Sequence, residues 1–293
     1  MEILALFCEI DDFCRVFEKL YQPRALKGQK RCRNRKTKLS LSEVMTILVM
    51  YHQSGYRNLK AFYLEKMCLQ HQADFPNLCS YRRFVQLQSR AVLPLFFYLA
   101  AKRGACTGIS FIDATALKVC HNLRIRAHRV FRGSAARTQS STGWYYGFKL
   151  HLAINECGEI LGFYVTAANV DERSTADWIS QDLWGKLVGD KGYISQTLFS
   201  KLMARGLQLI TKLKKKMHNR LMLLEDKLLL RKRSIIETVN DQLKNISNIE
   251  HTRHRSLWNF LGNVAAGLIA YSWKEKKPSL NLKFKRAVPS IVL

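Results

Sequence analysis

The sequence predicts an α/β fold in which a mixed sheet is flanked by helices and preceded by a small all-helical region. The first observation behind this is a change of pattern at Gly104. Before it, apolar residues recur at helical spacing; after it, short apolar and alternating runs typical of strands separate the helical segments. The second is the order of elements beyond Gly104, which favours a sheet with right-handed crossovers. We expect helices over residues 1–104, the sheet over 105–273 and a basic tail over 274–293.

The first hundred residues carry the helix signals. Ser40 and Glu43 stand in a capping-box pattern before the apolar run Val44–Tyr51, and Gly55 can end that helix. Pro94 is expected to bend or split a later helix. The further helices are predicted at about residues 2–20, 57–70 and 80–103.

Strand signals follow. Gly108–Asp113 is a short apolar run, whereas residues 121–143 are basic, lack a pattern and predict a loop. Apolar and polar residues alternate over 148–155, and the turn Asn155–Gly158 returns the chain into Ile160–Ala167, which predicts a hairpin. The remaining predicted elements are a helix at 172–184, a strand at 187–189, a helix from Ser195 to Gly206, a strand at 207–211, a helix near 228–247 and a C-terminal helix at Leu257–Trp273.

Charge indicates the partner. The chain has 48 Lys and Arg against 22 Asp and Glu, a formal net charge of +26. A polyanion would offset the resulting self-repulsion, so nucleic acid is the leading partner and an anionic membrane surface the second. The apolar share of 47% excludes a disordered basic tail. The basic run Lys27–Lys38 is either a solvated connector or a contact with a DNA backbone. Leu257–Trp273 is too short for a membrane span and predicts a buried helix, with a membrane-surface anchor as the minor alternative.

Acidic residues are almost absent from two long stretches. The only acid in residues 75–155 is Asp113, and the only one in 183–224 is Asp190. Both are expected to close a short apolar strand, and ligand sites gather at strand ends in open α/β sheets. Two carboxylates brought together there repel each other unless a cation lies between them, and oxygen ligands suit Mg²⁺ or Mn²⁺. The alternative is that each aspartate caps a helix or pairs with an arginine.

A third carboxylate is available on the basic helix near residues 228–247. Arg233, Glu237 and Lys244 have a spacing that places them on one helical face. A plain surface pair of Arg233 with Glu237 would stabilise the helix by only a few tenths of a kcal/mol. That alternative leaves the two isolated aspartates unexplained.

These motifs resemble the DDE transposases of bacterial insertion sequences, whose catalytic domain has a ribonuclease-H-like fold. The resemblance rests on FIDAT (Phe111–Thr115), VGDKGY (Val188–Tyr193) and RSIIETVNDQLK (Arg233–Lys244) and covers about residues 105–273. Several such transposases carry a Tyr-x2-Arg-x3-Glu-x6-Lys signature. The chain has its Arg, Glu and Lys, with Leu230 at the tyrosine position.

The resemblance implies a transposase that cleaves the ends of its insertion sequence and joins the 3′-hydroxyl to target DNA. Asp113, Asp190 and Glu237 would be catalytic and would hold Mg²⁺ or Mn²⁺, as two ions that clamp an in-line displacement at phosphorus. Residues 1–104 would serve DNA binding or assembly. The expected partners are double-stranded DNA, as terminal inverted repeats and target, and a second copy of the chain; no membrane is expected, and the location would be the bacterial cytoplasm at the nucleoid. The residues expected to bind DNA are Arg233, Lys244, Lys212, Lys214, Lys215 and Lys216.

Two other functions stay open at this point. A non-catalytic DNA-binding regulator would explain the charge but not the carboxylates. A ribonuclease-H-like nuclease that cuts without joining would explain both. The cluster Trp144–Tyr146 is expected to pack in the core, with stacking on an unpaired base as the alternative.

Overall fold

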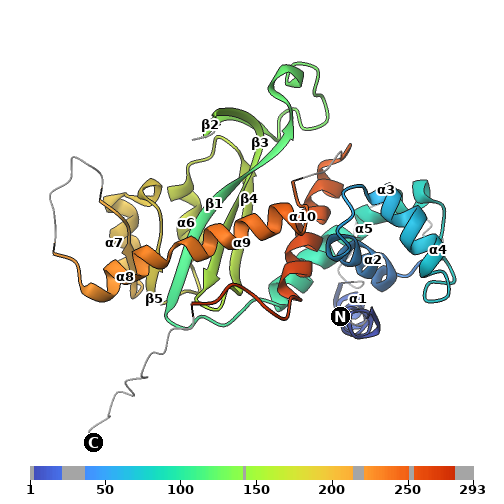
Figure 1. The fold of residues 1–293 in the computed structure, drawn as a ribbon, viewed down its shortest axis with the longest axis horizontal. Coiled ribbons are helices and arrows are strands. Elements are labelled where there is room, and N and C mark those ends of the chain that lie inside the picture. The colour runs from blue at the N-terminus through green and yellow to red at the C-terminus, as the bar shows by residue number, and fades with distance from the viewer. Residues whose placement is uncertain (1–2, 22–36, 141–142, 214–220, 251–253, 281–293) are drawn as a thin grey trace, which may run out of the picture.

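The computed structural model describes residues 3–21, 37–140, 143–213, 221–250 and 254–280. Figure 1 shows an elongated molecule, with a helical end and a sheet-containing end. Helix α10 (Leu257–Ser272), the last helix along the described chain, lies between them.

The helical end is built from α1 (Ile3–Tyr21), α2 (Leu41–Gln53) and α5 (Tyr81–Ala101). The predicted capping box is confirmed at α2, since the Ser40 hydroxyl accepts from the Glu43 N–H and the Glu43 carboxylate accepts from the Ser40 N–H. Gly55 has a φ of +73° just beyond α2, as a helix-ending glycine requires. α5 is not split at Pro94 but continues through it. The shorter helical elements are α3 (Leu59–Ala61), the π-helical turn η2 (Phe62–Met67) and α4 (Cys68–Gln70).

Within the described residues the sheet has six strands: β1 (Ile109–Cys120), β2 (Ala136–Ser140), β3 (Gly143–Asn155), β4 (Ile160–Ala167), β5 (Gly185–Val188) and β6 (Leu207–Ile210). Its main order is β4-β3-β1-β5-β6, with β2 also pairing with β3. β1, β3 and β4 are antiparallel neighbours, while β5 and β6 run parallel to β1. This mixed sheet, preceded by helices, has the ribonuclease-H-like arrangement that the sequence predicts.

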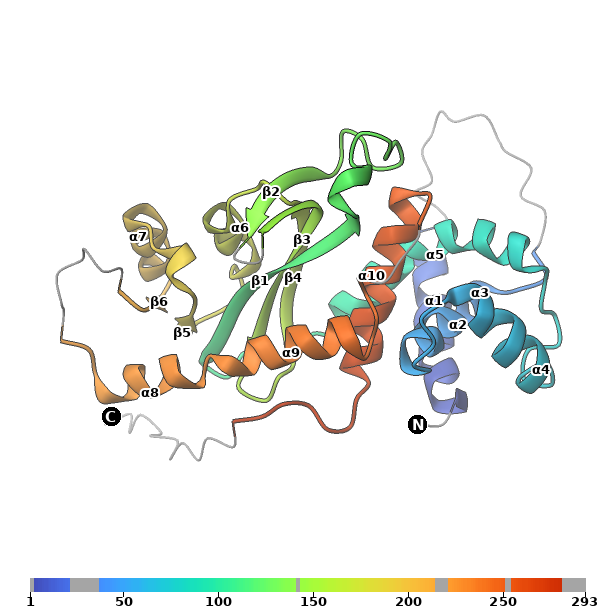
Figure 2. The same cartoon turned by 45° about the horizontal axis from the view of Figure 1, so that its top comes forward.

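The predicted loop at 121–143 is partly wrong. β1 runs to Cys120 instead of stopping at Asp113, because it keeps pairing with a long β3. Polar β2 then pairs with the first residues of β3. Between β1 and β2 the chain projects from the sheet toward α10 (Figure 2), where the ring of Phe131 contacts that of Phe260. A strand made largely of polar residues gives no apolar pattern, which is why β2 was missed.

Helices cover the sheet on both faces: α6 (Glu172–Ile179), η4 (Lys191–Tyr193), α7 (Gln196–Ala204), α8 (Leu224–Lys232) and α9 (Ser234–Asn245). α6 contacts β3 and β4, and α9 contacts β1. The helix predicted near 228–247 is two helices, with Arg233 ending α8 and beginning α9. The helix predicted at 172–184 stops at Ile179.

The larger of two buried clusters in the described chain forms a core that runs through both ends of the molecule, and the smaller one lies between the sheet and helices α6 and α7. α10 packs against α5 and α2 and buries most of its length, as expected for a buried C-terminal helix. Of the described helices, α5 alone is long and apolar enough to cross a membrane, and half of its apolar window is buried in this core. The division of the chain at residues 104 and 273 stays a prediction.

Candidate active site

The two isolated aspartates stand at matching positions of neighbouring strands. β1 and β5 pair in parallel until two residues before each aspartate, at Phe111 and Val188. Asp190 lies two residues beyond Val188, the last residue of β5, so the strand ends one residue earlier than the sequence predicts. Asp113 does not close its strand, because β1 continues beyond it. The register therefore brings both residues close to the point where β1 and β5 stop pairing.

The Asp113 carboxylate is held by α9. Its Oδ2 accepts a hydrogen bond of 3.0 Å from Asn240 Nδ2, and its Oδ1 lies 3.4 Å from Arg233 Nη1. Burial raises the pKa of Asp113 to about 6; the positive charge of Arg233 opposes this rise, and the charges of Glu172 and Glu237 add to it. One arginine thus does not compensate for burial, so an additional cation would stabilise the ionised form.

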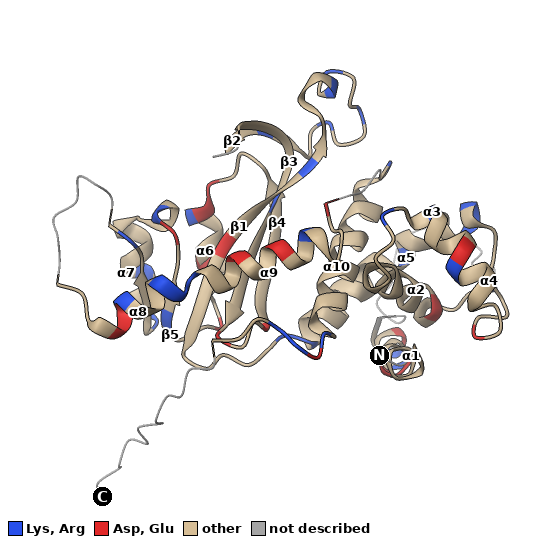
Figure 3. Cartoon of the chain, viewed as in Figure 1, with Lys and Arg blue, Asp and Glu red and all other residues tan. Residues whose placement is uncertain are grey.

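Arg233 bridges two of the predicted ligands. Besides Asp113 it reaches Glu237, one turn further along α9, through Nη2 at 2.5 Å from Oε1. The Arg233 side chain is 17% exposed and that of Glu237 56%. The surface pair considered from the sequence is therefore present, but its arginine also contacts a buried carboxylate. In Figure 3 the acidic positions of β1 and α9 lie near one another.

Asp190 differs from Asp113 in its surroundings. It is exposed, and among the described residues its carboxylate makes no hydrogen bond or ion pair; it does not cap η4 with its side chain. Its carbonyl accepts from the N–H of Tyr193 at 3.1 Å. Tyr193 itself is fully buried, and its hydroxyl has no hydrogen-bond partner within the described structure.

Asp113, Asp190 and Glu237 offer carboxylate oxygens, the ligand type that Mg²⁺ and Mn²⁺ prefer, and the hydroxyl of Tyr193, three residues after Asp190, has no hydrogen-bond partner in the described structure. They are not gathered tightly: in the described parts of the chain no three His, Cys, Asp or Glu side chains are close enough to enclose a metal ion. Because Arg233 lies between two of the carboxylates, a cation bound there competes with its guanidinium.

The predicted DNA-binding residues have different surroundings. Lys244 forms an ion pair of 3.4 Å with Glu250, whose other oxygen accepts from the Lys118 N–H. Lys212 is exposed just beyond β6. Leu230, at the signature's tyrosine position, is 8% exposed and belongs to the core. The remaining three, Lys214, Lys215 and Lys216, lie outside the described residues, as does most of the run Lys27–Lys38.

The aromatic cluster on β3 divides into two parts. Tyr145 and Tyr146 are buried, which confirms core packing for them. Trp144 is 50% exposed, with the guanidinium of Arg137 4.7 Å from its ring centre. Trp144 is thus the member that remains accessible to a nucleobase.

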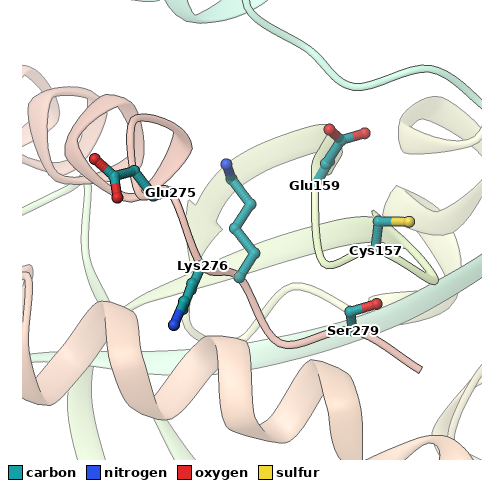
Figure 4. A pocket seen from close by; sticks show the side chains of 6 residues that line it. Cys157, Glu159, Glu275, Lys276 and Ser279 are labelled. Carbon is teal, nitrogen blue, oxygen red and sulfur yellow. The ribbon is translucent and has the colours of Figure 1, made fainter. Parts of the chain in front are cut away.

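A hollow of about 420 Å³ adjoins the site on the α6 side. Its lining residues are Lys149, Asn169, Val170, Asp171, Glu172, Arg173 and Gly192. A larger hollow of about 680 Å³ lies elsewhere, between the β3–β4 turn and the segment after α10 (Figure 4). Neither hollow is lined by Asp113, Asp190 or Glu237, but the smaller one includes Gly192 of η4, the short helix that Asp190 precedes.

Three residues of the site were missed by sequence reasoning. Asn240 hydrogen-bonds to Asp113, Glu172 adds negative charge near it, and Lys149 pairs with Glu172 at 3.1 Å. A signal for Asn240 existed, since it lies three residues after Glu237 and hence on the same helical face. Glu172 and Lys149 come from elements whose alignment with β1 only the folded sheet defines.

Comparison with known proteins identifies the family of the chain. The family described as "Transposase DDE domain" matches residues 103–257, more than half of the chain. The chain therefore belongs to the DDE transposase family. No curated protein matches it significantly. Among solved structures, one titled "Crystal structure of the Mos1 Strand Transfer Complex" is similar over 89% of this chain and 86% of that chain, at 9% identity and a TM-score of 0.23, which by itself does not establish a common fold.

Proposed function

We propose that this protein is a DNA transposase that cleaves the ends of its insertion sequence and joins the freed 3′-hydroxyl to target DNA. The observation that carries the proposal is the register of β1 and β5. It places Asp113 and Asp190 at matching positions, and α9 docks there with Asn240 on Asp113 and Glu237 one turn from Arg233. Family membership supports transposition as the process.

Asp113, Asp190 and Glu237 are the residues that would hold divalent cations, Mg²⁺ or Mn²⁺ and two in number. When bound, these ions supply charge neutralisation at phosphorus and lower the pKa of the attacking water or 3′-hydroxyl. Asn240 fixes the Asp113 carboxylate through Oδ2 and leaves Oδ1 to Arg233 or to a cation. Released from Asp113, the Arg233 guanidinium could bind a phosphate of the DNA strand.

Basic side chains would hold the DNA on either side of this centre. Lys244 lies two turns beyond Glu237 on α9, and Lys212 lies beyond β6, the strand next to β5. With Arg233, and with Lys214, Lys215 and Lys216, they form our proposed contact with double-stranded DNA, both terminal repeats and target. Pairing two DNA ends favours a homodimer or higher assembly. The location we propose is the bacterial cytoplasm at the nucleoid, without a membrane partner.

The test uses the full chain and duplexes that carry the DNA flanking its gene on each side. Incubation in Mg²⁺ or Mn²⁺ is compared with Ca²⁺, and strand nicking and strand joining are scored separately. We expect nicking at the element boundary in Mg²⁺, joining of the 3′-end to a second duplex, and neither in Ca²⁺.

The alternatives have distinct outcomes in the same assay. Binding without cleavage in any cation would identify a DNA-binding regulator and contradict the proposal. Cleavage in Mg²⁺ without any joined product would identify a ribonuclease-H-like nuclease. Asp190 favours catalysis over a purely structural set of acids, because its exposed carboxylate makes no hydrogen bond or ion pair within the described protein and is free to bind a cation.

A further inference from the structure

The start of α6 brings a fourth carboxylate to the site. Glu172 lies in the first turn of α6, directly after the N-cap Asp171. A Cβ placed on Gly192 would lie 3.2 Å from Glu172 Oε2. The Glu172 carboxylate therefore rests against the short segment Asp190–Tyr193, which also carries one of the proposed cation ligands.

Residues of β3 hold Glu172 and the first turn of α6 in place. Lys149 on β3 contacts Glu172 Oε1 at 3.1 Å and the Val170 carbonyl at 3.2 Å. Two residues further along β3, buried His151 contacts Thr175 through Nδ1 at 3.0 Å, which anchors the same turn of α6. The Glu172 side chain is 28% exposed. Two strand residues thus fix this carboxylate toward the site.

The buried hydroxyl of Tyr193 is a second, independent observation. The ring packs over Gly189, since a Cβ placed there would lie 3.0 Å from Tyr193 Cδ2. Burial raises the pKa of this hydroxyl, and the charges of Glu172, Asp113 and Asp190 raise it further, while Arg233 opposes them. A fully buried hydroxyl without a hydrogen-bond partner in the described structure is a group that a cation's bound water could satisfy. This points to a hydrated ligand beside Tyr193, on the segment that Glu172 contacts.

Glu172 and Glu237 reach this part of the sheet on different helices. Glu172 comes with α6, which packs on β3 and β4, and Glu237 comes with α9, which packs on β1. The two carboxylates are therefore positioned by different strands of the sheet.

We propose that Glu172 is a fourth carboxylate of the divalent-cation site and that Lys149 is the residue that positions it. The inference rests on the proposed function, because it assumes a cation at Asp113. It adds to the set of three carboxylates a ligand on α6, bound directly or through water.

The test is Mn²⁺ binding to the full chain without DNA, measured by calorimetry and by the electron paramagnetic resonance of free Mn²⁺. Glu172→Gln is compared with Glu225→Gln. Glu225 is a matched control because it also lies in the first turn of a helix and pairs with a strand lysine, Lys186, at 3.4 Å. We expect Glu172→Gln to weaken Mn²⁺ binding about 10-fold or more and Glu225→Gln less than about 2-fold.

Two further variants separate ligation from folding. Glu172→Asp keeps a carboxylate and should recover part of the affinity. Lys149→Met keeps Glu172 but removes its partner, and we expect a loss of about 3-fold. Thermal unfolding without Mn²⁺ shows whether each variant is folded. If Glu172→Gln misfolds, the Mn²⁺ affinities of Lys149→Met and Glu172→Asp decide whether Glu172 contributes to cation binding.

Equal Mn²⁺ affinity of folded Glu172→Gln and Glu225→Gln would overturn the inference, and an unchanged Lys149→Met would overturn the positioning role. Asp113→Asn distinguishes this failure from that of the proposed function. If Asp113→Asn loses both Mn²⁺ binding and DNA cleavage while Glu172→Gln binds Mn²⁺ normally, only the fourth ligand is wrong. If Asp113→Asn retains cleavage, the proposed active site is wrong, and if the unsubstituted protein does not cleave DNA in Mg²⁺, the proposed function itself is wrong.

Discussion

Two clusters of charged residues lie at opposite ends of β5, and they differ in how their charges balance. At the amino end, Lys186 contacts Asp226 at 2.7 Å and Glu225 at 3.4 Å. Burial alone would lower the pKa of Lys186, but its hydrogen bonds and ion pairs with both acids outweigh burial and raise it. At the carboxyl end, Asp190 has no partner among the described residues and neighbouring Asp113 has a raised pKa.

The difference separates a structural ion pair from a reactive site. Lys186 and Asp226 satisfy each other and attach α8 to the sheet. At the other end Arg233 is shared between Asp113 and Glu237, so negative charge remains uncompensated. Both clusters hold a helix against the sheet, but only the second retains the charge that a cation needs. The predictions below test this contrast.

The largest effect is expected for Asp113→Asn in DNA cleavage. Removing a proposed cation ligand should lower the rate of Mg²⁺-dependent nicking by about a thousandfold or more, because the lost transition-state stabilisation amounts to several kcal/mol. The rate is measured with labelled duplex at saturating Mg²⁺, with Glu225→Gln as the control. A rate within about tenfold of the unsubstituted protein would remove Asp113 from the site.

Substitutions in the cluster at the amino end of β5 should change the stability of the protein. Asp226 is 4% exposed, and Asp226→Asn leaves half-buried Lys186 with only Glu225, so we expect a loss of about 3 kcal/mol in the free energy of unfolding. Urea denaturation measures it. Replacing both partners, by Lys186→Met with Asp226→Leu, should restore most of the loss. An undiminished stability of Asp226→Asn would show that this pair does not hold α8.

Asp113→Asn should instead stabilise the protein in the absence of divalent cations. The pKa of Asp113 is about 6 in the folded chain, above the ordinary value of 3.8. The folded state therefore binds more protons than the unfolded state between these values, and stability falls as pH rises through this range. The asparagine side chain does not titrate, so above pH 6 the free energy of unfolding of the variant should exceed that of the unsubstituted protein by up to about 3 kcal/mol. Melting temperatures in chelator at pH 4 and pH 7.5 measure it; a variant that is less stable at pH 7.5 would contradict the account.

The smallest effect is expected at Lys244. Its ion pair with Glu250 already compensates part of its charge. Lys244→Gln should weaken DNA binding only several-fold, alike for all sequences, and reduce the slope of log affinity against log salt by about 1. The slope is measured by fluorescence anisotropy on a labelled duplex. An unchanged slope would mean that Lys244 serves Glu250 alone.

Local patterns allowed much of the fold to be predicted. Ser40 and Glu43 form their capping box, Ser195 caps α7, and Gly158 takes a positive φ of +71° in the β3–β4 turn, because each depends on residues only a few positions away. β2 and the break at Arg233 were not predicted. β2 exists through its pairing with β3, and the break falls in a helical pattern that continues on both sides of it.

In the candidate site, too, local patterns indicated some residues but not those that long-range packing brings together. The isolation of Asp113 and Asp190 in acid-poor stretches indicated them, and the helical spacing of Arg233 and Glu237 indicated a pair, which the structure contains. Glu172 could not be found in this way. It joins the site only through the packing of α6 on β3, which depends on residues distant along the chain.

The most direct test of the central claim is the variant Asp190→Asn, with Asp182→Asn as an exposed control. The Asp190 carboxylate has no hydrogen bond or ion pair in the described structure, so the substitution should leave the melting temperature unchanged. The account predicts that Asp190→Asn unfolds like the unsubstituted protein, binds DNA, and has lost Mg²⁺-dependent nicking, while Asp182→Asn cleaves normally. Normal cleavage by a folded Asp190→Asn would contradict the claim that this end of the sheet is the active site.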